Sequence, residues 1–245
     1  MSLTARFVVF SLTLGCAAPA VAQDRALAFE LGFGVQSAPA YEGSDEYVAA
    51  PALSGSVSTF RMLGLNVDRG DGMGFGFGPS FRVLPERTAK DHPRLTGIAN
   101  VDAAFELGAR VSWRWEGVEA WTAVRKGVTG HDGVVADVGS DIVHDYGQGT
   151  EVRFGPRLSM ANNEYASTYF SVPAGAALPA YSAGAGLYKV GLELGVRHDF
   201  NDAWAVKGTV GWDRLVGDVG DSPVVQSRDS GSVGVQVIRS FDFRF

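Results

Sequence analysis

The last stretch of the sequence, residues 232–245 (SVGVQVIRSFDFRF), alternates between apolar and polar side chains. Its apolar row consists of valines and phenylalanines: Val233, Val235, Val237, Phe241, Phe243 and Phe245. A period of two predicts a β-strand with one apolar and one polar face. Arg239 on the apolar row and Ile238 on the polar row are exceptions. Because a free edge strand this apolar would aggregate, the pattern favours a sheet that closes into a membrane barrel, with its final aromatics at the lipid interface.

The same alternation recurs along the chain. It predicts further strands at residues 27–35, 47–57, 60–67, 73–83, 102–116, 118–128, 134–142, 150–160, 188–196 and 204–212. The segment 102–116 is the clearest, since Trp113 and Trp115 share one face while Glu106, Arg110 and Arg114 share the other. Unpaired charges are costly in a dry core, whereas a barrel lets them face a wet lumen.

The fold class follows from these strands. The count of segments is odd, but bacterial barrels usually have an even number of strands. We therefore expect an all-β, transmembrane, antiparallel up-and-down β-barrel of about 12 strands, with about 10 as the alternative.

Composition and net charge argue against a helical membrane protein and against a nucleic-acid-binding protein. The 245 residues are 46% hydrophobic and 20% charged, and after the N-terminus no apolar run reaches the ~20 residues of a spanning helix. The formal charge of -6 does not indicate a nucleic-acid partner. We expect a single barrel domain over residues 23–245, in contact with outer-membrane lipid.

Residues 1–22 have the pattern of a secretory signal peptide. Arg6 precedes an apolar segment, and small residues lead to an expected cleavage between Ala22 and Gln23. The alternative is lipoprotein processing at Cys16, but Thr13 stands where a lipid-acceptor site normally has Leu. Cleavage after Ala22 would leave a mature chain without cysteine and hence without a disulfide.

Loop lengths predict the orientation. The turns near Gly117, Tyr146 and Asn201 are short, whereas most of the other connections are longer, and outer-membrane barrels keep their short turns on the periplasmic side. The longest connection, residues 162–185, could remain outside or fold inward as a plug.

Charged residues are expected on the lumenal rows of the strands. They are Glu30, Arg82, Glu106, Arg110, Arg114, Arg125, Asp137, Asp141, Glu151, Arg153, Arg157, Lys189, Glu193 and Arg197. They could form a selective pore or a paired network that fills a narrow barrel. Both signs occur in similar number, which favours the paired network.

Three His-Asp dipeptides begin at His131, His144 and His198 and raise the hypothesis of a hydrolase. Neighbouring strand residues point to opposite faces, however, so the two members of each dipeptide are poor partners. The sequence also lacks a Gly-x-Ser-x-Gly elbow and metal-ligand spacing. We expect no enzymatic site and no cofactor.

Two loops carry candidate interaction residues. The first includes Tyr41, Gly43, Ser44 and Asp45, and the second includes Asp221, Ser222 and Pro223. Loops concentrate binding residues, but Gly43, Ser44 and Pro223 could equally serve only to shape turns. At the C-terminus we expect Phe241, Phe243 and Phe245 to act as the signal for barrel assembly.

Five stretches resemble the outer-membrane family that includes the MltA-interacting protein (MipA) and OmpV. They are AYEGSD (40–45), NVDAAFELG (100–108), GPRLSMANNEYASTY (155–169), LPAYSAGAG (178–186) and LVGDVGDSPVV (215–225), in the order of the family. Residues 54–71 depart from the family pattern by being shorter, in the region where the strand count is uncertain.

The resemblance implies an outer-membrane barrel that acts as a scaffold, linking a lytic transglycosylase to a bifunctional penicillin-binding protein in peptidoglycan enlargement. Other relatives are porin-like proteins or adhesins. A narrow porin or substrate-specific channel is therefore the second hypothesis and an outer-membrane hydrolase the third. A fold alone does not fix function, so the scaffold role rests on the resemblance.

Overall fold

The computed structural model describes residues 26–62, 65–68 and 73–244. Its elements, in chain order, are β1 (Ala26–Pro39), β2 (Tyr47–Met62), β3 (Leu65–Asp68), β4 (Gly74–Leu84), the short 3-10 helix η1 (Pro93–Leu95), β5 (Ala104–Trp115), β6 (Val118–Gly127), β7 (Val134–Asp145), β8 (Thr150–Ala161), α1 (Asn163–Phe170), β9 (Gly186–Asn201), β10 (Trp204–Leu215), α2 (Gly217–Gly220) and β11 (Asp229–Arg244). The expected signal peptide and Phe245 lie outside the described residues.

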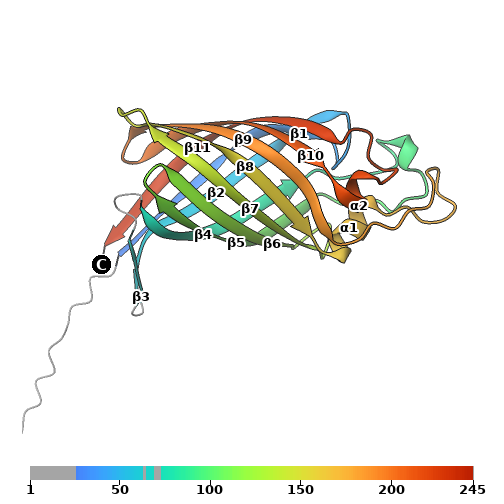
Figure 1. The fold of residues 1–245 in the computed structure, drawn as a ribbon, viewed down its shortest axis with the longest axis horizontal. Coiled ribbons are helices and arrows are strands. Elements are labelled where there is room, and N and C mark those ends of the chain that lie inside the picture. Colours follow the sequence, from blue (N-terminus) through green and yellow to red (C-terminus); the bar gives the residue numbers. More distant parts are fainter. Residues whose placement is uncertain (1–25, 63–64, 69–72, 245) are drawn as a thin grey trace, which may run out of the picture.

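The strands form one closed antiparallel sheet, seen from the side in Figure 1. Neighbours along the chain pair with each other, and β1 completes the ring by pairing with both β11 and β2. The wall contains 10 strands, because β3 pairs only with the end of β2. The expectation of an antiparallel barrel is confirmed; the expected twelve strands are wrong and the alternative of ten is correct.

The miscount arose at the end of β2. The sequence predicts separate strands at 47–57 and 60–67, but β2 continues to Met62 because it pairs with β1 along nearly its whole length. Thr59 to Met62 then pair with Leu65 to Asp68 in a small hairpin. The segment predicted at 60–67 is therefore part of a projection from the barrel, and it adds no strand to the wall.

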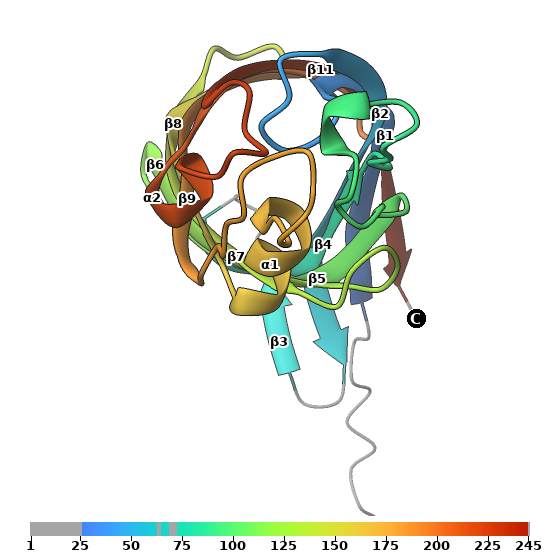
Figure 2. The same cartoon turned by 90° about the vertical axis from the view of Figure 1, so that its right-hand side faces the viewer.

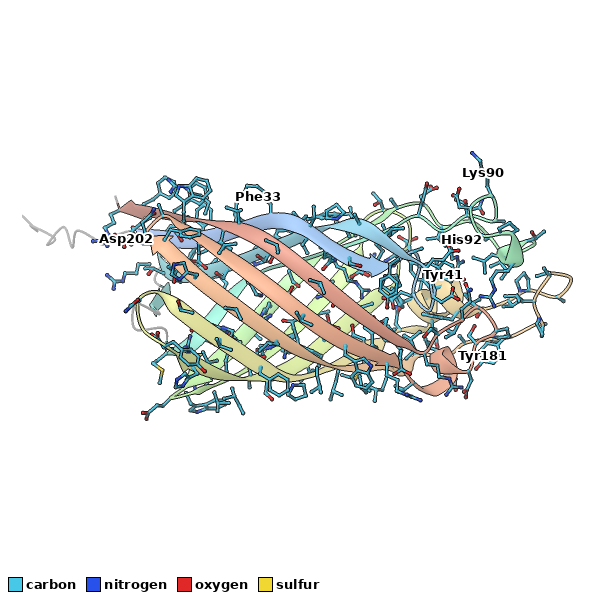
Figure 3. The ribbon with its side chains drawn as sticks, turned by 90° about the horizontal axis from the view of Figure 1, so that it is seen from above. Phe33, Tyr41, Lys90, His92, Tyr181 and Asp202 are labelled. Atoms are coloured by element: carbon cyan, nitrogen blue, oxygen red, sulfur yellow. The ribbon has the colours of Figure 1, made fainter. Side chains whose placement is uncertain are left out.

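The outer surface is apolar, as the alternating pattern predicts. Phe33 is 57% exposed and points away from the barrel in Figure 3. Exposed aromatic residues gather near the short turns: Phe75, Trp113, Trp115, Tyr146, Phe200, Trp204 and Phe243. Such a belt is typical of the region where a barrel meets the membrane interface.

Arg239, the exception on the apolar row, lies within this aromatic belt. Its guanidinium carbon is 4.9 Å from the ring centroid of Trp204, and its Nη1 donates to the carbonyl of Ala203 at 3.2 Å. Ile238, the opposite exception, is buried on the lumenal side. An arginine at the interface can keep its charge at the polar boundary of the membrane. Arg239 is therefore compatible with the lipid-facing row of this strand.

The two ends of the barrel differ. The short turns lie at the same end as the start of β1 and the end of β11, whereas α1, α2 and the long loops lie at the other (Figure 1). In Figure 3, Asp202 marks the first end and Tyr181 the second. Because short turns face the periplasm in outer-membrane barrels, we assign the loop end as the extracellular mouth.

One strand departs from strict alternation. The sequence pattern places Tyr188 on the apolar row with Leu192 and Leu194, but the pairing of β8 with β9 shifts at this point, so that Ser159 faces Lys189 and Met160 faces Leu187. This bulge turns Tyr188 into the interior, where it is 1% exposed. Tyr188 therefore does not face lipid, as strict alternation over residues 188–196 would predict.

Candidate functional site

The loop between β8 and β9 folds back into the extracellular mouth and carries α1 there. Figure 2 shows α1 inside the ring of strands when the barrel is viewed from the mouth. Asn162 caps the helix, since its side chain accepts a hydrogen bond from the backbone N–H of Tyr165. The inward arrangement, one of the two considered for residues 162–185, is the one observed.

An apolar cluster holds α1 in the mouth. From the helix it contains Tyr165, Ala166, Tyr169 and Phe170, all buried. From the surrounding strands and loops it contains Val101, Val135, Ala161, Ala183, Tyr188, Leu215 and Val219. Because these partners come from distant parts of the sequence, the cluster ties the helix to much of the rim.

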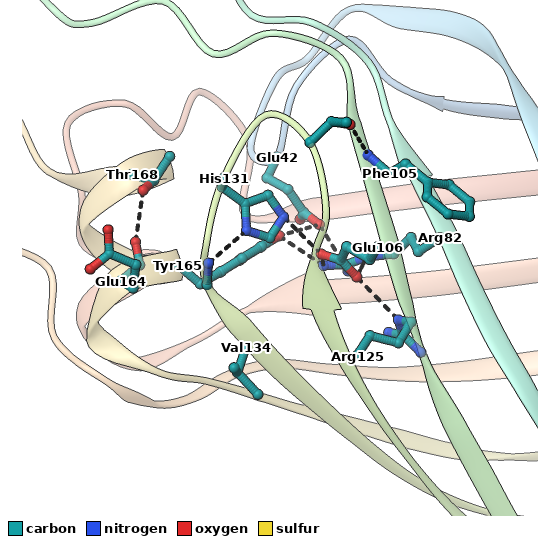
Figure 4. Close-up of polar contacts among 12 residues, drawn as sticks. Glu42, Arg82, Phe105, Glu106, Arg125, His131, Val134, Glu164, Tyr165 and Thr168 are labelled. Atoms are coloured by element: carbon teal, nitrogen blue, oxygen red, sulfur yellow. Dashed lines mark hydrogen bonds and ion pairs between the residues drawn. The ribbon is translucent and has the colours of Figure 1, made fainter.

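A polar layer lies directly beneath α1 (Figure 4). Arg82 on β4 donates to both carboxylate oxygens of Glu106, at 2.8 and 2.7 Å. The same guanidinium donates to the hydroxyls of Tyr165 and Tyr188, each at 3.1 Å. Tyr165 in turn donates to Glu42 at 3.4 Å. This layer therefore links α1 to three strands and to the first mouth loop.

Glu106 is the centre of that layer and is fully buried. Besides Arg82, it accepts from Nε of Arg125 at 3.1 Å and lies 3.2 Å from Nε2 of His131. Nδ1 of His131 accepts the backbone N–H of Gly133 at 3.0 Å, which places the imidazole proton on Nε2, the nitrogen nearer the carboxylate. A buried carboxylate with this many donors is strongly held in its ionised form.

Burial also affects the tyrosines of α1. It raises the pKa of the Tyr165 hydroxyl well above its ordinary value, because a phenolate there would lose its hydration. It raises the pKa of Tyr169 for the same reason. Both side chains are therefore neutral across the physiological range.

A second arginine secures the end of α1. Arg87, in the loop between β4 and β5, is 1% exposed and donates to the carbonyls of Tyr169 at 2.5 Å and Thr168 at 3.1 Å. A further bond joins it to the carbonyl of Ala99. A cation at the C-terminal carbonyls of a helix complements the helix dipole.

The two predicted interaction loops come together above this layer. Arg94 donates to the hydroxyl of Tyr41 at 3.1 Å and to the carbonyls of Pro223 and Val224 at 3.1 and 2.7 Å. Tyr41 also donates to Gln226. In Figure 3, Tyr41 and His92 mark this part of the mouth.

Several of the predicted residues in these loops are buried and contact neighbouring residues of the mouth. Ser44 and Ser222 are buried, and Ser222 donates to the carbonyl of Phe170 at 2.5 Å. Gly43 has φ +90° and lies so close to Val225 that a Cβ would approach it at 2.9 Å. Asp45 and Asp221 are the exposed members. The role of this set as interaction sites stays a prediction.

The three histidines of the His-Asp dipeptides lie apart. His131 is in the mouth, whereas His144 packs on Tyr146 and His198 contacts the hydroxyl of Thr150 at 2.9 Å, both near the periplasmic turns. In residues 26–62, 65–68 and 73–244, no hydrogen bond or ion pair joins any of these histidines to the aspartate that follows it. Their geometry therefore gives no support to an imidazole that is oriented by the aspartate of its own dipeptide; the carboxylate near His131 is that of Glu106.

Below the mouth, the lumen contains two cavities. One, of about 420 Å³, lies under α1 and is lined by Tyr41, Tyr169 and Lys189 among others. The other, of about 690 Å³, extends to Asp145 and Thr150 at the periplasmic end. All the charged residues expected to face inward do so: Glu106 is part of the layer under α1, and the others line one or both cavities.

Ion pairs cross the lumen between strands. Arg197 bonds both oxygens of Glu30, at 2.8 and 2.7 Å. Arg114 of β5 bonds Glu151 of β8 at 2.8 Å, and Arg153 of β8 bonds Glu119 of β6 at 3.1 Å. These contacts agree with the paired network that the balance of charges favours.

Six charged residues that line the cavities are not in the predicted set. They are Glu42, Glu119, Asp145, Asp199, Lys207 and Asp213. Lys207 could have been found, because it alternates with the outward-facing Trp204 and Trp212 on the same strand. Glu42 could not, because it lies in a loop and reaches the lumen only through the folding of the mouth.

Within the described ranges, no three or more His, Cys, Asp and Glu side chains are grouped so that they could hold a metal ion. No helix in the same part of the chain is long and apolar enough to cross a membrane.

A closed antiparallel sheet with an apolar outer face and a charged lumen defines a transmembrane β-barrel, and this one is a protein of the outer membrane. The family described as MltA-interacting protein MipA matches residues 31–241. The chain belongs to the MipA family, and the resemblance seen in the sequence is confirmed.

Solved outer-membrane proteins are similar in fold at low sequence identity. An outer membrane channel from Pseudomonas putida F1 is 9% identical, with a TM-score of 0.42, and the match covers 91% of this chain and 97% of that one. Neisserial surface protein A is 10% identical, with a TM-score of 0.32, covering 88% of this chain and 99% of that one. No curated protein matches the chain.

Proposed function

We propose that this protein is a scaffold of the cell envelope. Its barrel anchors it in the outer membrane, and its periplasmic face brings together a lytic transglycosylase and a bifunctional penicillin-binding protein. The name of the family, MltA-interacting protein, supports a protein partner. The pairing of both enzymes on one barrel is the finer part of the proposal and comes from the resemblance of the sequence.

The observation that carries the proposal is the filling of the mouth by α1. The helix is held by the apolar cluster around Tyr165 and by the contacts of Arg82 below it. A barrel of ten strands filled in this way is poorly suited to free diffusion of solutes, because side chains fill the interior of small barrels. A structural or binding role agrees better with this arrangement.

The periplasmic end offers a surface for partners. The hairpin of β2 and β3 projects beyond the wall at this end (Figure 1), and within the described residues its outer strand, β3, pairs only with β2. An extended backbone edge can receive a strand of another protein. We therefore assign partner binding to the periplasmic turns and this hairpin.

The test has two arms on the same refolded protein. In a planar lipid bilayer the protein is expected to give no stable conductance. Immobilised in detergent, it is expected to retain a purified lytic transglycosylase and a purified bifunctional penicillin-binding protein, each added alone and then together. A barrel that retains neither enzyme contradicts the scaffold.

A loop-deletion variant is the matched control for the conductance arm. Replacing residues 163–184 by a short Gly-Ser linker should produce conductance while partner retention is unchanged. This outcome would show that residues 163–184 block conductance and that the partners bind at the periplasmic end.

The second candidate is a narrow, substrate-specific channel. The observation in its favour is the pair of lumenal cavities of about 420 and 690 Å³, which share several lining residues. A reproducible conductance of the complete protein would favour this function over the scaffold.

The proposal includes no enzymatic role. His144→Ala and His198→Ala are expected to leave partner retention and barrel assembly unchanged. Loss of a hydrolytic activity in either variant would instead support the hydrolase hypothesis.

A further inference from the structure

The two lumenal cavities meet at a common layer of side chains near the middle of the barrel. The residues that line both are Ser54, Gly55, Arg110, Arg157, Glu193 and Lys207. We call this layer the junction. It contains three cations and one carboxylate, a surplus of positive charge at the point where the two cavities join.

Two of the cations have defined partners. Arg157 is 2.7 Å from Asp141 and 3.2 Å from Glu193, so it has carboxylates on two sides. Arg110 is held differently: its guanidinium carbon lies 3.9 Å from the ring centroid of Trp121, and its ion pair with Glu119 is longer, at 3.6 Å. Stacking on an aromatic face leaves the N–H edge of a guanidinium available to an anion.

The third cation has no such partner. In the described part of the chain, no hydrogen bond and no ion pair within 4.0 Å engages the ammonium of Lys207. The charged groups that act on it are Glu193, which attracts it, and Arg110, Arg153 and Arg157, which repel it. With one attracting carboxylate and three repelling guanidinium groups around it, the ammonium favours a further negative charge beside it.

The backbone around Lys207 leaves room for its side chain. On β10 the residue pairs with Arg197 of β9 and Gln236 of β11. Its Cε passes Gly195, where a Cβ would lie at 3.6 Å. The stem is therefore supported along the wall, while the ammonium faces the two cavities.

We propose that the junction binds a small soluble oxyanion, of the carboxylate or phosphate type, between the Lys207 ammonium and the Arg110 guanidinium. Such pairs of cations bind oxyanions through charge-assisted hydrogen bonds. Rings of charged side chains select ions by sign in membrane pores. The larger cavity reaches Asp145 and Thr150, so the anion enters from the periplasm. This site does not depend on the scaffold role.

Binding is measured with the complete protein refolded in an uncharged maltoside detergent, which excludes lipid phosphate. The probe is inorganic phosphate, followed by the width of its phosphorus NMR signal, with acetate added as a competitor. Wild-type protein should broaden the signal, and acetate should compete at higher concentration. Competition by acetate would show that the same site binds carboxylates as well as phosphate.

Three variants test the location. Lys207→Gln should weaken phosphate binding by about tenfold or more, as expected from the loss of one charge-assisted hydrogen bond. Glu193→Gln removes the competing carboxylate and should tighten binding by about threefold. Lys90→Gln removes the same charge from an exposed mouth loop, marked in Figure 3, and should leave binding unchanged.

Lys207→Gln should weaken phosphate binding whereas Glu193→Gln should strengthen it, so a general folding defect cannot explain both results. A misfolded variant can lose binding but cannot gain it. No broadening by the wild-type protein would overturn the proposal. So would equal binding by Lys207→Gln and Lys90→Gln, because the anion would then be held elsewhere on the surface.

Discussion

Arg82 donates to the hydroxyl of Tyr165 at 3.1 Å, although 83 positions separate the two residues in the sequence. The contact joins a strand of the wall to the helix that fills the mouth. Because the same guanidinium is fixed by Glu106, withdrawal of α1 would leave a half-buried cation without one of its acceptors. Hydrogen bonds as well as packing therefore connect α1 to the wall of the barrel.

Tyr165→Phe tests this connection. The variant keeps the ring but removes the hydroxyl that accepts from Arg82 and donates to Glu42, and should lower the free energy of unfolding by about 1–3 kcal/mol. Urea titrations followed by heat-modifiable gel migration measure the difference. Tyr146→Phe, at an exposed turn, is the control and should have no effect. Equal midpoints for the two variants would contradict the prediction.

Glu106→Gln should be more damaging. The substitution leaves the buried Arg125 and the half-buried Arg82 without their shared, fully buried carboxylate, and breaking a buried ion pair costs about 3–5 kcal/mol. The same urea titration measures the loss. Glu116→Gln removes an equivalent charge from an exposed turn and provides the comparison. A Glu106→Gln barrel as stable as the control would show that the charge network contributes little.

Alkaline pH should loosen the plug. Burial holds the pKa of Tyr165 and Tyr169 above the ordinary value of 10.0, with Arg82, Glu42 and Glu106 as the charged neighbours of Tyr165. In the filled mouth the hydroxyls keep their protons, whereas in a released loop they would lose them. The stabilisation is therefore complete below about pH 10 and is lost as the pH rises above it.

Bilayer conductance between pH 8 and pH 11 measures this effect. Conductance should rise with pH in the wild-type protein. In the double variant Tyr165→Phe, Tyr169→Phe the pH-dependent rise should be smaller, since neither ring can ionise. A rise of equal size in both proteins would assign it to other titrating groups.

The C-terminal aromatics are predicted to direct assembly. Phe241 and Phe243 stack on Phe29 of β1, with ring centroids 5.0 and 6.1 Å apart, at the seam where the last strand meets the first. Replacing Phe241, Phe243 and Phe245 by Ser, or deleting Phe245, should leave the protein unassembled or degraded in the periplasm. Heat-modifiable migration of membrane fractions is the measurement.

Phe200→Ser is the matched control for these variants. Its ring is also exposed near the periplasmic end but lies away from the seam. It should assemble normally. Normal barrels from the C-terminal variants as well would show that the terminus has no special role.

The wall of the barrel was predictable because its pattern is local. Each strand faces lipid on one side and the lumen on the other. The alternation of side chains therefore predicts the environment of each residue, and no knowledge of its distant partners is needed. Glu106 and Arg110 were placed inward on this basis alone. The number of strands was harder to predict. The length of β2 depends on its pairing with β1, which its own sequence does not show, and β3 pairs with the end of β2.

The mouth was harder to predict because its contacts are non-local. Asn162 as a helix cap, followed by Tyr165 and Tyr169 on one helical face, is a signal for α1 that sequence analysis could have used. The inward turn of Tyr188 had no such signal, because a bulge results from the pairing of two strands. The meeting of Tyr41 with Arg94 likewise arises only when the loops assemble.

The difference between the two ends of the barrel has a consequence for its contents. If α1 blocks the mouth as proposed, then with the larger cavity reaching the other end the interior is a recess of the periplasm rather than a passage through the membrane. A solute in it exchanges with the periplasm alone, so its occupancy follows the composition of that compartment. The barrel can in this way hold a periplasmic solute inside the membrane without transporting it.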